Sequence, residues 1–557
     1  MANIPTPTGS PGVRLQTIDL SLTISPKAAL YVAALLPSNF GESDKIIDLG
    51  SEAELVDVFG EPTSANYEEW FNISRVWKYK VAGLGATIKV VRAVGDGSLN
   101  GTVEVSKNEV IANPTTQLIQ NREEATTATI VFDEDSNATP VDACLKLFTA
   151  FPTSYGYKIA LATSTDFATA DIVTGVSFKD NFEVAPETDE VAIAVLDEGD
   201  NIIEKWVVAG VPGHVDGYGQ DIYLETVLNE KSKYIYGFIN DSISFEPVSF
   251  EAVEVAGGVN VAPAKGDLAL ALDKFKNTEA VDVNYVLAHP DLHAETITLC
   301  ESRQDCAFRA GVPVSTVVGM PQGTALENVS EYSDNVLTTS TSYGSIAANA
   351  LFVFDKYNNK SWWINAAGDM IGLRVMQNLS SQPFFSDAGL NHGKLKEVRK
   401  LAQYWDANDI RTLQEKRFIP IILKQGVGIV KWGQRNYFSK PSALRDEGVR
   451  ELINYVWRAA KVFLSYKLFD FNDGFTRSSI ETKIRRFLAN VQDSRGIRRR
   501  DDGSDGFVAR CDSTNNPSDV INQNMLVVDV GFLPARAIEE IWFRVSIASD
   551  GIQLDKL

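Results

Sequence analysis

The first patterned segment of the chain alternates apolar and polar positions. This period of two is typical of a half-buried β-strand. Residues 1–12 ahead of it are rich in Pro, Thr, Gly and Ser and have little to bury, so we expect residues 1–20 to form an extended arm. Such a strand could pair within its own chain or add to a neighbour's open sheet edge. The alternating apolar residues are Val13, Leu15, Ile18, Leu20, Leu22 and Ile24.

Buried strands and amphipathic helices follow. The apolar run at residues 28–36 predicts a strand, and Ser51 with Glu54 three residues later predicts a capping box that opens a helix to Phe59. A second helix is expected near residues 67–81, and residues 86–94 have the continuous apolar pattern of a fully buried strand. Strand, helix, helix and strand together are typical of an α/β layer.

The character of the chain changes over residues 97–258, where Thr, Val, Ile, Asp and Glu dominate and turn signals recur. The pattern predicts a β-rich, acidic insertion with a hairpin around residues 198–201, and it leaves open two modules with a break near residue 186. The α/β pattern resumes with a strand at 283–291 and a helix at 292–310. We therefore expect an α/β core domain formed by residues 21–96 together with 259–386, interrupted by an outer domain at 97–258.

Long amphipathic patterns mark the C-terminal region, residues 387–557. Helices are predicted at 448–468 and 479–491, and alternating strands at 525–532 and 538–549, before a short tail. The expected fold class is a multidomain α/β (α+β) protein: mixed α/β core and C-terminal domains, an inserted β-rich outer domain and extended terminal arms.

Composition narrows the function classes. A chain of 557 residues with 44% hydrophobic residues can bury several cores, and no apolar run approaches the length of a membrane span, so a cytosol-like compartment and no membrane insertion are expected. Four scattered cysteines indicate reduced packing residues rather than a disulfide framework. The net charge of −21 argues against nucleic acid as the partner. Residues 391–500 nevertheless carry 24 Lys and Arg against 11 Asp and Glu, while the remainder carries 28 against 62.

Candidate chemistry is sparse. Gly95, Gly97 and Gly101 follow a strand but lack the helix start that a dinucleotide fingerprint needs, so a domain-linking turn is favoured. His289 and His293 lie near Cys300 and Cys306, all possible zinc ligands, but Pro290 separates the two imidazoles. Two Asp-rich loops, 133–135 and 501–506, lack the spacing of a Ca2+ loop. We predict no catalytic, cofactor or metal site and no enzyme; an α/β enzyme built around His289 is the distant alternative.

Several long strings resemble one family. Residues 10–13 (SPGV) resemble its N-terminal start, and LVDVFGEPT (55–63) with VVRAV (90–94) resembles its first core block. AGDMIGL (367–373) and AGLNHGKL (388–395) resemble the block before the C-terminal domain. The densest similarity is in LFDFNDGFTRSSI (468–480), RCDSTNNPSDVINQN (510–524) and FLPARAIEEIWFRV (532–545). These strings resemble the tail sheath proteins of contractile, T4-like phages.

That resemblance implies a structural subunit of the virion tail. Such subunits stack as six-membered rings into a helical cylinder around a tail tube, between baseplate and tail terminator, and contract to drive the tube through the host envelope for genome delivery. Assembly would take place in the host cytoplasm. Terminal arms of the family add strands to neighbouring subunits, which assigns strand exchange to Val13 through Ile24. A bacteriocin-like or secretion-type contractile particle is the alternative within this class.

The resemblance also implies that the basic C-terminal region faces the tube. Charge on amphipathic helices is often only a solvated face, but clustered basic residues could grip an acidic tube. The preferred candidates are Lys483, Arg485 and Arg486, and the second choice is Arg450, Arg458 and Lys461.

Overall fold

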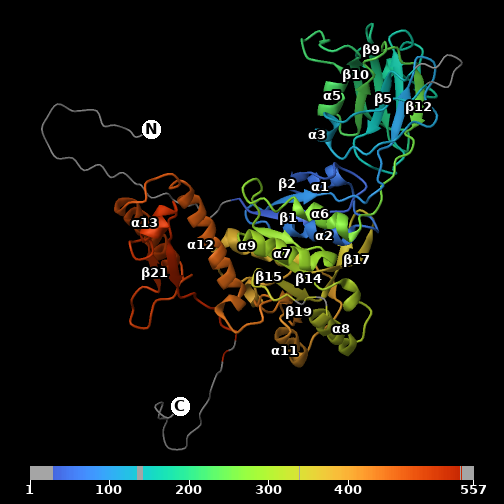
Figure 1. Ribbon diagram of the computed structural model, residues 1–557. Coiled ribbons are helices and arrows are strands. Elements are labelled where there is room, and N and C mark those ends of the chain that lie inside the picture. Colours follow the sequence, from blue (N-terminus) through green and yellow to red (C-terminus); the bar gives the residue numbers. More distant parts are fainter. Residues whose placement is uncertain (1–28, 135–141, 336, 338, 540, 542–557) are drawn as a thin grey trace, which may run out of the picture.

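The computed structural model describes residues 29–134, 142–335, 337, 339–539 and 541. Figure 1 shows an α/β core in the middle, the β-rich insertion projecting from one end and the C-terminal helices to one side. The fold is thus multidomain α/β, as the sequence predicts. The predicted arm strand and the strand at 538–549 lie outside the described residues, apart from positions 538, 539 and 541 of the latter.

An eight-stranded sheet, the largest in the described part of the chain, forms the centre of the core. Its middle strands run parallel, and an antiparallel strand closes each edge. Parallel strands need helices on both faces, which explains the long apolar runs in the sequence. In spatial order the strands are β2 (Ile46–Leu49), β3 (Thr87–Val91), β1 (Tyr31–Leu35), β13 (Tyr285–Leu287), β14 (Ala307–Gly311), β15 (Gly344–Ala348), β19 (Ile419–Lys424) and β20 (Gly428–Lys431).

Alternate side chains of each strand enter different hydrophobic clusters. Val32 and Ala34 of β1 belong to one cluster, and Ala33 and Leu35 to the other, so the sheet is buried on both faces. The first face is covered by α1 (Glu52–Phe59), α2 (Tyr67–Val76) and α9 (Ala367–Ser380), with a small antiparallel sheet of β16 (Ala350–Asp355), β17 (Lys360–Asn365) and β18 (Lys400–Leu401). The second is covered by α6 (Lys265–Asp273), α7 (His293–Arg303), α8 (Gln322–Asn335) and α11 (Ala407–Glu415).

Helices α2 and α9 approach closely because α9 carries two glycines. A Cβ on Gly368 would lie 2.1 Å from the carbonyl oxygen of Asn72, and one on Gly372 would lie 2.2 Å from the ring of Tyr79. Beside this contact, Arg75 Nη2 donates to Asp369 Oδ1 at 2.6 Å, with both side chains buried. The AGDMIGL string therefore matters for packing: its small residues let two helices meet.

The insertion is a two-layer β structure. Its sheets, in the orders β11-β5-β4 and β10-β9-β6-β12, share one hydrophobic cluster that contains Leu147 of the first and Ile159 and Val195 of the second. The three-stranded sheet has β4 (Thr102–Val105), β5 (Leu145–Thr149) and β11 (Ile235–Ile239). The other has β6 (Lys158–Thr163), β9 (Glu190–Leu196), β10 (Ile202–Ala209) and β12 (Phe250–Glu254); α3 (Arg122–Ala125), α4 (Phe178–Asn181), α5 (Leu224–Lys231), β7 (Asp171–Val173) and β8 (Val176–Ser177) flank the sheets.

Two chain segments join the insertion to the core and lie against each other. The Gly95 amide donates to the Val261 carbonyl at 2.9 Å, and a Cβ on Gly95 would lie 2.5 Å from the oxygen of Ala262. Buried Arg92 donates to the Pro152 carbonyl of the insertion at 2.7 Å and to the Ser38 carbonyl of the core at 2.8 Å. The glycine motif is therefore a domain-linking turn, because it sits where entering and leaving segments touch.

The C-terminal region contains two long helices, α12 (Glu447–Ser465) and α13 (Gly474–Asp493), and a two-stranded antiparallel sheet of β21 (Phe507–Arg510) and β22 (Asp529–Phe532). Leu452 of α12, Leu488 of α13 and Phe507 of β21 share one hydrophobic cluster. The short helix α14 (Ser518–Asn522) follows β21 in this region, whereas α10 (Gly389–His392) lies against β20 of the core sheet.

Three sequence expectations about boundaries are wrong. The predicted helix at 292–310 ends at Arg303, because Gln304 adopts a left-handed conformation with φ of 60° and residues 307–311 form β14. A break near residue 186 is wrong because β6 pairs with β9, and β5 with β11, across that position. A boundary at 386 does not separate core from C-terminal region, because β19 and β20 complete the core sheet. The hairpin around 198–201 is confirmed as the β9–β10 connection.

Candidate functional site

The carboxyl ends of β1 and β13 lie side by side where the strand order changes direction, since β2 and β3 lie on one side of β1 and the later strands on the other. Open α/β sheets bind ligands in such a crevice. Here His289 Nε2 lies 3.2 Å from Glu69 Oε1, and Glu68 accepts from Asn365 Nδ2 at 2.7 Å. Burial, together with the adjacent Glu69, raises the pKa of Glu68 to about 7.

The crevice has almost no free space. Its cavity volume is about 10 Å³, which is room for roughly one water molecule. The protein's own side chains, among them Leu35 and Asn72, fill the place that a substrate would occupy. This geometry counts against an α/β enzyme built around His289.

The predicted metal-ligand types do not converge. His293 Nδ1 lies 2.5 Å from the Tyr332 hydroxyl, and burial lowers the pKa of His293 to about 4, whereas His289 contacts Glu69. Cys300 and Cys306 are buried thiols whose sulfur atoms lie 3.7 Å apart. Within the described ranges no cluster of three or more His, Cys, Asp or Glu side chains has the arrangement of a metal site. All four cysteines are free and buried.

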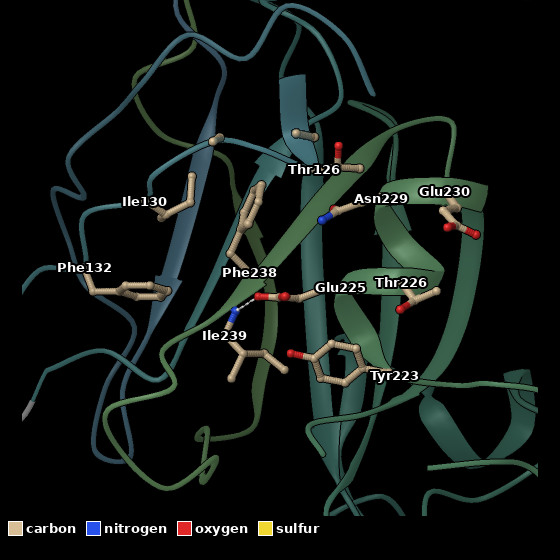
Figure 2. Close-up of a pocket in the computed structure, with 12 residues that line it drawn as sticks. Thr126, Ile130, Phe132, Tyr223, Glu225, Thr226, Asn229, Glu230, Phe238 and Ile239 are labelled. Carbon is tan, nitrogen blue, oxygen red and sulfur yellow. Dashed lines mark hydrogen bonds between the residues drawn. The ribbon is translucent and has the colours of Figure 1, made fainter. Parts of the chain in front are cut away.

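The insertion contains a larger hollow, of about 380 Å³. Figure 2 shows Ile130 and Phe132 on one wall and Tyr223 and Glu225 on the other. Glu225 Oε1 accepts from the Ile239 amide at 2.8 Å, and burial together with Glu225 raises the pKa of the Tyr223 hydroxyl. None of the 12 lining residues is Lys, Arg, His or Cys, so no cationic side chain, imidazole or thiol lines the hollow.

The second-choice basic residues on α12 face the core. Arg450 is buried; its guanidinium lies 4.1 Å from the centre of the Tyr343 ring and donates to the Ser342 hydroxyl. Arg458 donates to the Asp305 carbonyl at 2.8 Å, and Lys461 pairs with Glu279 at 2.8 Å. These residues hold α12 on the core, so they are poor candidates for a partner contact: Arg450 is wrong because it is buried, and the other two have partners within the chain.

The preferred basic residues lie on the exposed part of α13. Lys483 lies over the Phe463 ring of α12 at 4.8 Å, and Arg485 pairs with Glu481 at 3.0 Å while its side chain stays 48% exposed. Arg486 is exposed on the helix side opposite buried Ile484. The structure thus places all three basic residues near the surface of α13.

A buried cluster of ionic side chains, which the sequence analysis missed, joins the core to α12. Lys431 Nζ of β20 lies 2.8 Å from Asp387 Oδ1 and 2.7 Å from Glu447 Oε2 of α12. The cluster contains three cations and three carboxylates, and each of these side chains is at most 5% exposed. Its members are Arg309, Arg374, Lys431, Asp387, Glu447 and Glu451.

Electrostatics in this cluster favour the charged forms. Burial alone would raise the pKa of Asp387, but Arg374, Lys431 and Arg309 lower it to about 2. The same carboxylates raise the pKa of Arg374 against the effect of its burial. An acidic residue on a helix carries no signal in sequence that it will be buried against three cations, which is why the cluster was not predicted.

The sheet β21–β22 has only two strands in the described part of the chain. A lone two-stranded ribbon is marginal by itself and leaves backbone donors and acceptors unpaired along both edges. Its inner face packs on α13 through Phe507 and Ala509. The arm residues that could add to such an edge, Val13, Leu15, Ile18, Leu20, Leu22 and Ile24, lie outside the described residues.

Two solved sheath tail proteins share this fold. A sheath tail protein from Listeria innocua superposes with a TM-score of 0.55, covering 93% of this chain and 95% of its own, at 10% identity. Another from Desulfitobacterium hafniense gives 0.53, covering 90% and 93%, also at 10% identity. The fold is therefore that of sheath-type tail proteins.

Sequence comparison is more specific. Residues 439–548 match the phage tail sheath C-terminal domain family. The tail sheath protein of Enterobacteria phage T4 is 26% identical over 95% of this chain and 84% of its own length. That of Vibrio phage KVP40 is 28% identical over 66% of this chain, and the aligned part spans 56% of the relative. This chain is thus similar to the tail sheath proteins of contractile phages over nearly its whole length.

Proposed function

We propose that the chain is the structural subunit of a contractile tail sheath. It polymerises around a tail tube and contracts to drive that tube through the host envelope for genome delivery. The observation that carries this proposal is the similarity to a phage tail sheath protein over 95% of the chain. The relatives named above are phage proteins, which favours a virion over a bacteriocin-like or secretion-type particle.

The role is structural rather than catalytic. The crevice at the strand switch point is closed to about 10 Å³, and no lysine, arginine, histidine or cysteine lines the 380 Å³ hollow. Among the described residues no helix is both long and apolar enough to span a membrane. The proposed activity is assembly, with the baseplate and tail terminator as partners at the ends of the cylinder.

Strand exchange would link the subunits. The arm at residues 1–20 carries alternating apolar residues, and among the described residues no third strand pairs with the β21–β22 ribbon, so its edges can accept one. Main-chain pairing of this kind tolerates sliding of rigid domains, because the links at the arms persist while the domain contacts change. Subunits thus stay connected as the packing switches.

Contact with the tube is assigned to α13. Lys483, Arg485 and Arg486 are exposed there, in a region with a positive balance of charge. Each exposed ion pair is worth only about 0–1 kcal/mol, but repetition around each ring multiplies the effect. The triple charge reversal K483E/R485E/R486E should weaken assembly on purified tubes, most strongly at low ionic strength where the charges are least screened, and leave tube-free polymerisation intact.

A matched control separates local from general charge effects. K107E/K233E/K265E makes the same change of charge at lysines whose side chains are 59–64% exposed on the insertion and core, so it should co-assemble with tubes as the wild type does. Unchanged co-assembly of the α13 variant across a salt series would remove these residues from the interface. Electron microscopy of the purified chain tests the function itself: a sheath subunit forms cylinders, and a chain that stays monomeric at high concentration would refute the proposal.

A further inference from the structure

An exposed apolar surface lies where α12 turns into α13. Four aromatic side chains and one leucine, here named the aromatic tip, project from the end of α12, the connecting loop and the first turn of α13. Their exposed fractions run from 66% for Leu468 to 104% for Phe469. The tip consists of Tyr466, Leu468, Phe469, Phe471 and Phe475.

This surface is large for a protein without a partner. A large aromatic side chain presents about 150–250 Å² when fully exposed, so the tip offers on the order of 800 Å². The largest apolar patch of a typical monomer is about 300–600 Å². A standard protein interface buries about 800 Å² on each partner. The tip alone therefore has the area of one side of a stable interface.

The loop that displays the rings is held in place by polar contacts. Asp473 caps α13 by accepting from the Thr476 amide at 2.8 Å, and Asn472 Nδ2 donates to the Met525 carbonyl at 2.8 Å. Lys467 pairs with Asp470 at 2.7 Å. Phe469 itself has φ of 71°, a conformation that costs a non-glycine residue free energy. An ordered loop thus presents its aromatic side chains to solvent at a cost to the isolated chain.

We propose that the aromatic tip docks on a second copy of this chain, a contact that rests on the proposed sheath function. A sheath is a polymer of one chain, so every copy is surrounded by others, and the area of the tip matches what such a contact needs. The charges of the loop also favour a second copy over the tube. Lys467, Asp470 and Asp473 give the loop no positive excess, which contact with an acidic tube would require.

The contact is heterologous. The tip is a projection on one part of the subunit, so the surface that receives it belongs to another part of the next copy. A head-to-tail contact of this type builds rings or open helices rather than a closed dimer. The tip therefore gives each subunit a directional, apolar link that does not depend on salt.

The test uses the full chain with F469D/F471D. Both side chains are at least 87% exposed, so the folded subunit should keep its melting temperature. The matched control is Tyr218→Asp, which alters a 93% exposed aromatic residue of the insertion. By sedimentation and electron microscopy without tubes, wild type and Y218D should form cylinders. The tip variant should need at least a tenfold higher concentration, with little change between low and high salt.

Other outcomes are informative. Normal tube-free polymerisation of the tip variant overturns the contact, and if the same variant then fails on purified tubes, the tube is the occupant instead. Should F469D/F471D melt early, F469S/F471S is measured in its place, and its normal polymerisation likewise overturns the inference. If the wild-type chain itself never polymerises, the proposed sheath function is overturned. The tip variants alone cannot give that result, so failure of the tip contact and failure of the sheath function are distinguishable.

Discussion

Lys431 offers the sharpest test of how the core holds the C-terminal region. Its side chain is fully buried and its ammonium contacts two carboxylates, Asp387 at 2.8 Å and Glu447 at 2.7 Å. Lys431→Met keeps most of the volume but removes one cation from a cluster of three cations and three carboxylates. Three buried carboxylates then share the remaining Arg309 and Arg374, and one negative charge is left uncompensated.

Breaking a buried ion pair by removing one partner costs about 3–5 kcal/mol. One kcal/mol lowers the melting temperature of a domain of 150–250 residues by about 2–4 °C. We therefore expect the core transition of the K431M subunit to fall by about 6 °C or more at pH 7 in differential scanning calorimetry.

The pH dependence has a defined sign. The folded-state pKa of Asp387 is about 2, below the ordinary value of about 3.9. A depressed carboxyl pKa stabilises the fold above about pH 4, and this contribution, about 2–3 kcal/mol, is lost as pH falls toward 2. Because Lys431 supplies part of the depression, the difference between K431M and wild type should narrow below pH 4.

The matched control is Lys233→Met. Lys233 pairs with Asp57 at 3.0 Å, but the two side chains are 61% and 65% exposed. An exposed pair contributes about 0–1 kcal/mol, so this variant should melt close to wild type. If K431M melts within 2 °C of wild type at pH 7, the buried cluster does not stabilise the junction between core and α12, and the argument fails.

Three further outcomes follow from the packing. Gly372→Ala should destabilise the core by about 1–3 kcal/mol, because its Cβ would lie 2.2 Å from the Tyr79 ring, whereas Gly266→Ala, with open space around its Cβ, should be neutral or stabilising; equal melting temperatures would contradict this. Deleting residues 1–20 should leave a folded subunit that forms no cylinders, and normal polymerisation would refute the arm as the link. Replacing residues 97–258 with a short Gly-rich linker should preserve assembly, and loss of all soluble protein would place the insertion in the core.

Local pattern in the sequence was sufficient to predict much of the core. The apolar run at 28–36 contains β1, and the run at 86–94 contains β3, because a strand buried on both faces needs apolar residues at nearly every position. The predicted helix start at Ser51 is confirmed, but only half of the capping box forms. The Ser51 hydroxyl accepts from the Glu54 amide, whereas the Glu54 carboxylate accepts from the amide of Gly50 at 2.8 Å and not from that of Ser51. Ordered strings such as LFDFNDGFTRSSI were sufficient to indicate the family.

The site was harder to predict. The sequence predicted Arg450 and Arg458 as basic residues on an amphipathic helix. It could not show that the face of the helix carrying these two arginines packs on the core. It also could not show that Lys431, far from α12 in the linear pattern of charges, meets Glu447 inside the protein. The sequence alone does not distinguish a charged side chain that is solvated from one that is buried.

The sequence by itself determined strands β1, β3 and β13 of the core, the β-rich insertion, the helical character of residues 447–493 and the similarity to the sheath family, since each depends on periodicity or on ordered local strings. Only the tertiary structure decided that β19 and β20 complete the core sheet, that the ionic cluster is buried and that the aromatic tip is exposed. The physical reason is that the burial of a side chain depends on which other element of the fold packs against it. Phe469 and Phe507 are equally apolar, and only the elements packed around each determine which ring faces solvent.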